Sequence, residues 1–303
     1  MSELPTSSKR RSRSSARSSG RSSARSSGRF GEAQKKAAIE QLGWGIPSYI
    51  DAPIEVVNEE ILEKIHDTSL KVLEEIGILF LNEEARGILK AIGCDVNDAT
   101  ENVRFDRDLV LAAIKTAPAT TTMTPRNPDH LVHVGGKHFA YSAVASAPNV
   151  SDLDGGRRVG NRADYQNMLR LNQYFNCLHF VAGYPVEPID LHASTRHLDA
   201  TYDMLTLTDK VIHAYALGPE RIEDVMDMVR IAGGLTEAEF QATPRMFTNI
   251  NSTSPLKHDW PMLDGAMRAA RRGQMVVVSP FTLSGAMAPA TVVGALVQQN
   301  AEF

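Results

Sequence analysis

The sequence contains only two cysteines, Cys94 and Cys177, which lie far apart and outside any Cys-x-x-Cys pattern. We therefore expect free thiols, and we predict neither a disulfide framework nor a cysteine-bound metal. No stretch of about 18 consecutive apolar residues is present, so no transmembrane helix is predicted. The N-terminus also lacks the apolar segment of a secretory signal, and we expect a cytoplasmic protein.

Metal-binding motifs are incomplete in this sequence. The segment 152–155 (Asp-Leu-Asp-Gly) begins like a calcium loop, but Ala163 stands where that loop needs a glutamate, so we interpret it as a turn with two exposed carboxylates. His192 and His197 are five residues apart, whereas a zinc-binding pair on a helix is four apart and encloses a glutamate. We predict no metal site.

The net charge of −4 hides an uneven distribution. Residues 1–30 carry eight Lys and Arg against Glu3 alone, a net +7, so the other residues carry −11. The segment 14–21 recurs unchanged as residues 22–29, and such an Arg/Ser/Gly-rich tail has almost no apolar surface to bury, so residues 1–36 are predicted to be disordered. A basic tail can bind a polyanion, or it can be a solvated extension. Because the rest of the sequence is acidic, we do not expect a nucleic-acid partner.

Helix patterns dominate residues 37–140. Apolar residues recur at helical spacing in 58–75, and further helices are predicted at about 83–92 and 107–116. The segment 131–141 has a Gly-Gly pair between possible strands, which predicts a β-hairpin that turns at this pair. We therefore predict an α-rich N-terminal subdomain with a β-hairpin over residues 37–140.

From residue 141 the pattern changes to alternating strands and helices. The predicted strands are 178–183, 211–217, 246–250 and 275–279, and the predicted helices are about 162–175, 193–207, 219–233, 259–272 and 288–302. Such alternation, without a Gly-x-Gly-x-x-Gly loop, favours an α/β fold of the (β/α)8 TIM barrel type. We predict about the first five of its eight units in residues 141–303. The last helix shows no stop signal before Phe303, so we expect a C-terminally truncated part of a larger barrel.

Polar and aromatic residues are expected at the ends of the predicted strands and just after them, at the positions where parallel β/α folds bind their ligands. They are Tyr184, His213, Tyr215, Asn249, Asn251, Ser252, Phe281 and Ser284. Aromatic faces with few full charges suit a methylated ammonium cation through cation–π attraction, and the alternative is that the two tyrosines are core residues. The predicted substrate-binding residues are Tyr184, Tyr215, Asn249, Asn251, Phe281 and Ser284, and no catalytic residue is assigned.

Four segments of the sequence resemble the trimethylamine:corrinoid methyltransferase family. They are 72–78, 113–118, 134–136 and, most specifically, 284–302. The resemblance runs from about residue 55 to the end of the chain, and it implies a TIM barrel in a protein longer than this one. The Arg/Ser-rich tail departs from the family pattern.

The resemblance implies transfer of a methyl group from a tertiary or quaternary amine to the Co(I) corrinoid of a separate protein. Archaeal trimethylamine members use a pyrrolysine, whose position would lie beyond Phe303, and many bacterial relatives lack it and are similar to glycine betaine methyltransferases. The aromatic, weakly charged strand ends favour a betaine-type substrate over trimethylamine. The interpretation is a bacterial, non-pyrrolysine member of the family.

The expected partners follow from the same resemblance. No Asp-x-His-x-x-Gly segment is present, so we expect the corrinoid (cobalamin) to be supplied by a cognate corrinoid protein, with no cofactor bound directly. We also expect a homo-oligomer. The alternatives are another TIM-barrel enzyme of amine metabolism, or an inactive truncated fragment that acts only as a binding protein.

Overall fold

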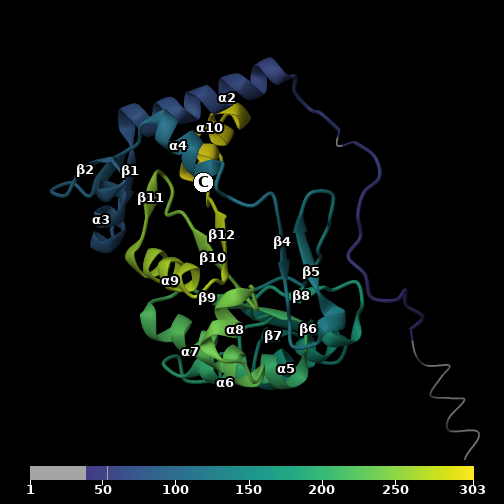
Figure 1. Ribbon diagram of the computed structural model, residues 1–303. Coiled ribbons are helices and arrows are strands. Elements are labelled where there is room, and N and C mark those ends of the chain that lie inside the picture. Colours follow the sequence, from purple (N-terminus) through teal and green to yellow (C-terminus); the bar gives the residue numbers. More distant parts are fainter. Residues whose placement is uncertain (1–38, 53) are drawn as a thin grey trace, which may run out of the picture. The chain divides into compact units, whose positions relative to one another are not determined.

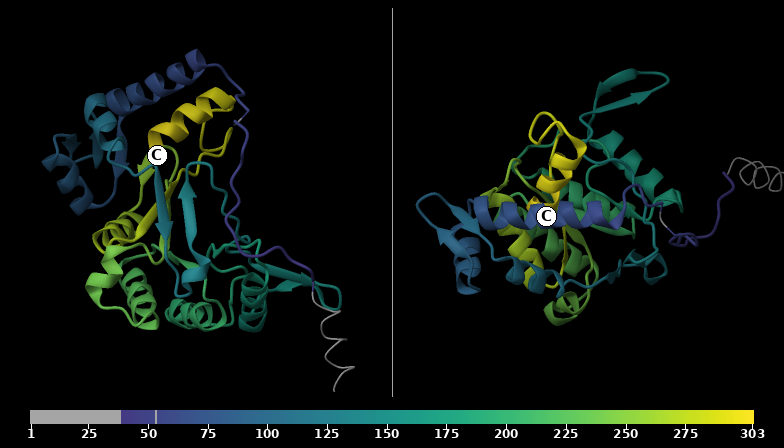
Figure 2. Two further views of the ribbon diagram at one scale, coloured as in Figure 1. Left: turned by 45° about the vertical axis from the view of Figure 1, so that its right-hand side comes forward. Right: turned by 90° about the horizontal axis from the view of Figure 1, so that it is seen from above.

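The computed structural model describes residues 39–52 and 54–303, so the predicted disorder of residues 1–36 lies outside the described residues. Figure 1 labels the helices and strands, and Figure 2 shows two further views. The elements named below belong to one unit, Leu42–Phe303. Together they confirm the prediction of a mixed α/β structure.

The first helices confirm the three predicted for this part of the chain. They are α2 (Glu59–Lys71), which continues into the π-helical turn η1 (Val72–Ile76), α3 (Glu83–Ala91) and α4 (Arg107–Ile114). α2 begins where the Asn58 side chain accepts a hydrogen bond from the Ile61 backbone N–H, 3.0 Å away. Gly77 ends η1 with φ +80°, and a Cβ at Gly77 would lie only 2.4 Å from the carbonyl oxygen of Val103. A glycine is therefore required at this stop.

A small sheet connects these helices to a distant part of the chain. Its strands are β1 (Ile78–Phe80), β2 (Asp95–Asn97), β3 (Asn102–Arg104) and β11 (Lys257–His258), in the order β11-β1-β3-β2. β1 pairs parallel with β11, with Leu79 opposite Lys257. Residues near 80 and near 257 are thus held side by side.

The prediction of a hairpin that turns at Gly135-Gly136 was wrong. The hairpin elements are β4 (Thr120–Met123), the 3-10 helix η2 (Pro128–His130) and β5 (Val132–Gly135). β5 pairs antiparallel with β4, which precedes it, so the turn lies between them. β4 has the sequence Thr-Thr-Thr-Met and lacks the apolar alternation by which a strand is recognised. Gly135 is needed at the strand end, because a Cβ there would lie 2.2 Å from the carbonyl oxygen of Ala119.

A parallel sheet confirms the predicted strands of the second half. It consists of β8 (Phe180–Val181), β9 (Val211–Tyr215), β10 (Phe247–Asn251) and β12 (Met275–Ser279), in the order β12-β10-β9-β8. Ser142 forms a parallel bridge with Phe180 beside β8. A separate hairpin, β6 (Asn149–Asp152) and β7 (Gly156–Val159), precedes β8. Because the strands are parallel, their carboxyl ends lie at one edge of the sheet, where ligands bind in such folds.

The helices of this half also confirm their predictions. They are α5 (Arg162–Tyr174), α6 (Arg196–Leu207), α7 (Pro219–Ala232), the short additional α8 (Glu237–Ala242), α9 (Trp260–Arg271) and α10 (Val292–Glu302). α5, α7 and α9 pack on the sheet, where Ile212 and Ala214 of β9 join their apolar core. The alternate residue Val211 packs with Phe247 and the β4–β5 hairpin. Strand alternation places His213 and Tyr215 on the same face as Val211.

α10 packs against α2, and the two helices lie side by side in Figures 1 and 2. The Ser69 hydroxyl donates to the Val297 carbonyl oxygen over 2.9 Å, which ties the two helices together. Within residues 39–52 and 54–303, the helices lack the length and apolar character of a membrane span.

Candidate functional site

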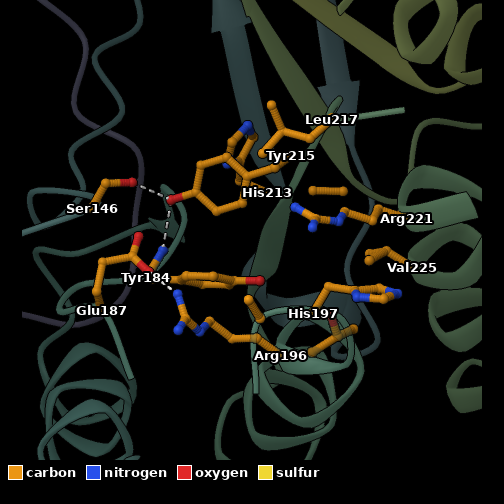
Figure 3. Close-up of a pocket in the computed structure, with 13 residues that line it drawn as sticks. Ser146, Tyr184, Glu187, Arg196, His197, His213, Tyr215, Leu217, Arg221 and Val225 are labelled. Atoms are coloured by element: carbon orange, nitrogen blue, oxygen red, sulfur yellow. Dashed lines mark hydrogen bonds and ion pairs between the residues drawn. The ribbon is translucent and has the colours of Figure 1, made fainter. Parts of the chain in front are cut away.

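A cavity of about 240 Å³ opens at the carboxyl ends of β8 and β9 (Figure 3). It is lined by Ser146, Tyr184, Glu187, Ala193, Arg196, His197, Thr201, His213, Ala214, Tyr215, Leu217, Arg221 and Val225. Ser146 comes from the segment before β6, and the other lining residues come from the end of β9, from the loops that follow β8 and β9, and from the first half of α6 and of α7. The cavity is thus at the edge of the sheet where the sequence placed the substrate.

Two tyrosines form the aromatic part of this cavity. The rings of Tyr184 and Tyr215 are 4.9 Å apart at an angle of 70°. The Tyr215 hydroxyl accepts a hydrogen bond from the Tyr184 backbone N–H (3.1 Å) and lies 2.7 Å from the Ser146 hydroxyl. Gly183 makes room for this contact, because a Cβ there would lie 2.4 Å from the Tyr215 hydroxyl oxygen. Burial raises the pKa of both phenols, so both rings are neutral at physiological pH.

His213 lies beside the tyrosines and is buried. Its ring centroid is 4.7 Å from that of Tyr215. Its Nε2 accepts a hydrogen bond from the Asn249 backbone N–H (3.0 Å), so the proton of the neutral ring is on Nδ1. Nδ1 is buried and has no hydrogen-bond partner among the described residues. Burial lowers the pKa of His213 to about 4, which keeps the ring neutral.

Besides His213 and the two tyrosines, the cavity is lined by the ionisable side chains of Glu187, Arg196, His197 and Arg221, and sequence reasoning did not assign them to a ligand site. Arg196 lies 3.7 Å from the Glu187 carboxylate, whose pKa is raised by burial, and the His197 ring is 2.8 Å from Asp224. Arg221 lines the cavity from the first turn of α7. Their positions in the sequence could have indicated them, because Arg196 and Arg221 each lie in the first turn of a helix that follows a strand and its loop.

The two predicted asparagines belong to a hydrogen-bond network between β10 and β12. Asn249 donates from its side-chain amide to Asn251 Oδ1 (3.1 Å) and accepts from the Ser279 hydroxyl (2.7 Å). Asn251 donates in turn to the Ser279 carbonyl oxygen (3.1 Å). These amides therefore bond to the strand ends, and neither asparagine lines the cavity described above.

Phe281 and Ser284 lie in the loop after β12 and do not line the cavity with the two tyrosines. Phe281 is 49% exposed, and its backbone N–H donates to the Ser252 hydroxyl over 2.9 Å. The Ser284 hydroxyl donates to the Pro289 carbonyl oxygen (2.9 Å). The structure thus brings Tyr184 and Tyr215 together and leaves the other predicted residues at the β10–β12 side.

Comparison with family models matches residues 18–303 to trimethylamine methyltransferase (MTTB). The chain belongs to this methyltransferase family. The resemblance seen in the sequence is thereby confirmed. Among the described residues, no group of three or more His, Cys, Asp and Glu side chains is placed to hold a metal ion.

Several known methyltransferases have sequences similar to this chain over most of its length. A glycine betaine methyltransferase of Desulfitobacterium hafniense (strain Y51) is 33% identical over 86% of this chain and 53% of its own length. A trimethylamine methyltransferase MttB of Desulfitobacterium hafniense (strain DSM 10664 / DCB-2) is 29% identical over 81% and 49%. A proline betaine:corrinoid methyltransferase of Eubacterium limosum is 25% identical over 81% and 51%. The chain spans about half the length of these relatives.

The segment that carries the most specific family resemblance ends at a buried carboxylate. Glu302, at the end of α10, is 1% exposed. Its Oε2 accepts from the hydroxyls of Ser252 (2.5 Å) and Ser254 (2.6 Å), and its Oε1 accepts from the Leu256 backbone N–H and the Gln298 amide (each 2.8 Å). Glu302 thus fixes the loop after β10, and through Ser252 it also holds the loop after β12.

Proposed function

We propose that this protein transfers a methyl group from a methylated amine, of the betaine or trimethylamine type, to the Co(I) corrinoid of a cognate partner protein. Membership of the methyltransferase family supports methyl transfer, and the names of similar members supply the donors glycine betaine, trimethylamine and proline betaine. The observation that carries the proposal is the cavity that Tyr184 and Tyr215 line at the carboxyl ends of β8 and β9.

We propose a TIM barrel as the architecture around this cavity. Four parallel strands in sequence order, with α5, α7 and α9 packed on one face, support that assignment. Residues 141–303 would supply about five of the eight units, and residues 37–140 would form the α-rich N-terminal subdomain with the β4–β5 hairpin.

The tyrosines suit the chemistry of a methylated ammonium. A fully methylated nitrogen has no N–H to donate, so aromatic faces supply the attraction, at ~0.5–2 kcal/mol per ring. When the methyl group leaves to the nucleophilic Co(I), the nitrogen loses its positive charge. A strong counter-charge would stabilise the charged donor more than the transition state, and the weaker attraction of neutral rings makes this penalty smaller. Glu187, the nearby carboxylate, faces Arg196 at 3.7 Å.

The other predicted residues have proposed roles at the β10–β12 side. Asn249 and Asn251 hold the ends of the two strands through Ser279, as their hydrogen bonds indicate. Phe281 and Ser284 remain proposed substrate contacts on the loop after β12, since the exposed Phe281 ring is free to meet a ligand there.

Methyl transfer is tested directly. We expect the full-length protein, mixed with a reduced corrinoid protein of the kind its relatives use, to methylate the corrinoid with glycine betaine or proline betaine faster than with trimethylamine. The change in corrinoid absorbance measures the reaction, and a mixture without amine is the control. If none of the three amines methylates the corrinoid, the proposed activity is wrong.

The loop after β12 is tested by a pair of phenylalanine variants. We expect Phe281→Ala to weaken amine binding several-fold, because it removes an aromatic face at the strand ends. Phe175→Ala, at the end of α5, should leave the affinity unchanged. Calorimetric titration with the best amine compares the two, and equal effects would remove the loop from the proposed site.

A further inference from the structure

One arginine that lines the cavity is not balanced by a neighbouring carboxylate among the described residues. Arg221 is half-buried in the first turn of α7, and it has no hydrogen-bond or ion-pair partner among the described residues. The other arginine at the cavity has an opposite charge beside it, since Arg196 faces Glu187 at 3.7 Å, and the His197 ring faces the Asp224 carboxylate at 2.8 Å. The guanidinium charge of Arg221 is therefore left without a counter-charge.

Two helix N-termini add to this positive character. Seven of the α-helices in residues 54–303 begin with a side-chain cap, whereas α6 and α7 have no side-chain cap hydrogen bond. These two helices begin beside the cavity, so their first backbone N–H groups favour negative charge there. A helix end alone does not define a site, but here buried side-chain donors point to the same kind of ligand.

Three lining side chains, His213, Arg196 and His197, have buried nitrogens with no hydrogen-bond partner among the described residues. In His197 this nitrogen is Nδ1, since Nε2 faces Asp224 at 2.8 Å. His213 is 5% exposed, and its protonated Nδ1 donates to no described residue. The Arg196 Nε is likewise buried without a partner. A buried donor without an acceptor costs free energy, and a ligand oxygen in the cavity would remove that cost. The unsatisfied groups of His213 and Arg196 are donors, and together with the guanidinium of Arg221 they indicate an anionic group on the ligand.

We propose that Arg221 binds the carboxylate of a zwitterionic substrate, so that the cavity selects betaines over methylated amines that have no carboxylate. Figure 3 shows the guanidinium end of Arg221 directed toward the space beside the Tyr184 and Tyr215 rings. The ammonium lies against the two rings, and the carboxylate meets the guanidinium. Arg221 is thus a specificity-determining residue, and the inference rests on the proposed function.

The test uses two cations that differ in the carboxylate. Binding of glycine betaine and of choline, which has the same trimethylammonium group and no carboxylate, is measured by calorimetric titration of the full-length protein. Arg221→Gln is compared with Arg157→Gln, an exposed arginine on β7. We expect Arg221→Gln to weaken glycine betaine binding at least about tenfold. Choline binding should change less than twofold, and Arg157→Gln should change neither affinity.

A second variant separates charge from shape. Arg221→Lys keeps the positive charge but loses the planar pair of donors, so it should restore part of the betaine affinity that Arg221→Gln loses. Thermal unfolding of each variant is the control. We expect the unfolding temperature to stay close to that of wild type, because Arg221 is half-buried and has no partner among the described residues.

The outcomes distinguish the inference from the proposed function. Unchanged betaine affinity in Arg221→Gln, or an equal loss for choline, overturns the role of Arg221 and leaves methyl transfer standing. Wild-type protein that binds choline but not glycine betaine overturns the carboxylate subsite in the same way. Wild-type protein that binds neither cation overturns the cavity as the substrate site, and with it this inference.

Discussion

Replacing Glu302 by alanine is expected to lower the free energy of unfolding by about 3 kcal/mol or more. The side chain is buried, and its two carboxylate oxygens accept from four donors, on Ser252, Ser254, Leu256 and Gln298. Each donor left buried without an acceptor costs about 1–3 kcal/mol, and water that enters the new space recovers part of this loss. Denaturant unfolding measures the change.

Two further variants complete this experiment. Glu302→Gln keeps the shape and one acceptor oxygen, while the two serine hydroxyls can rotate to accept from the new amide, so the loss should be smaller than for alanine. Glu63→Ala, on the exposed side of α2, should change the stability little. A loss for Glu302→Ala no larger than for Glu63→Ala would contradict the assignment of Glu302 as the residue that holds the loop after β10.

The stability of the protein should fall as the pH is lowered from 6.5 to 4, in part because of His213. Its pKa is about 4 in the folded state and about 6.5 in an unfolded chain. Between these values the unfolded state binds a proton that the folded state does not, so acid favours unfolding. The difference in pKa lowers the free energy of unfolding by about 3 kcal/mol at pH 4 relative to pH 7, and below about pH 3 this contribution no longer changes.

A substitution isolates this contribution from those of other groups. His213→Gln keeps an oxygen able to accept the Asn249 backbone N–H but does not titrate. Burial also lowers the pKa values of His179 and His258, and their effect is common to both proteins. Denaturant unfolding at a series of pH values should therefore show a steeper loss for wild type than for the variant. Parallel curves would mean that His213 is protonated or exposed in the folded state.

The sequence predicted elements best where local signals agree. The helix that starts after Asn58 has a cap, an apolar period and a glycine stop, and the structure confirms it. The strand at 211–217 is apolar and ends in a loop before a helix start, and β9 occupies most of it. The hairpin prediction was wrong because the glycine pair was interpreted as its turn. Gly135 instead ends β5, where its backbone lies too close to the Ala119 carbonyl oxygen for a side chain.

The candidate site was predicted only in part. Tyr184 and Tyr215 were predicted because the first follows a strand and the second ends one, and their rings lie 4.9 Å apart at the cavity. Arg221 was missed because an arginine in the first turn of a helix reads as a solvated residue. The role proposed for Arg221 rests on its having no hydrogen-bond or ion-pair partner among the described residues, and a local sequence pattern does not show this.

The family and the element order were determined by the sequence itself, because periodicity, caps and family-specific segments are properties of neighbouring residues. The tertiary structure decided which of those residues meet. Parallel pairing brings the β8 and β9 ends together, so Tyr184, Tyr215 and Arg221 line one cavity although they are far apart in the chain. It also turns Glu302 from the end of an amphipathic helix into the buried acceptor of a distant loop, because burial and hydrogen-bond satisfaction depend on contacts across the fold.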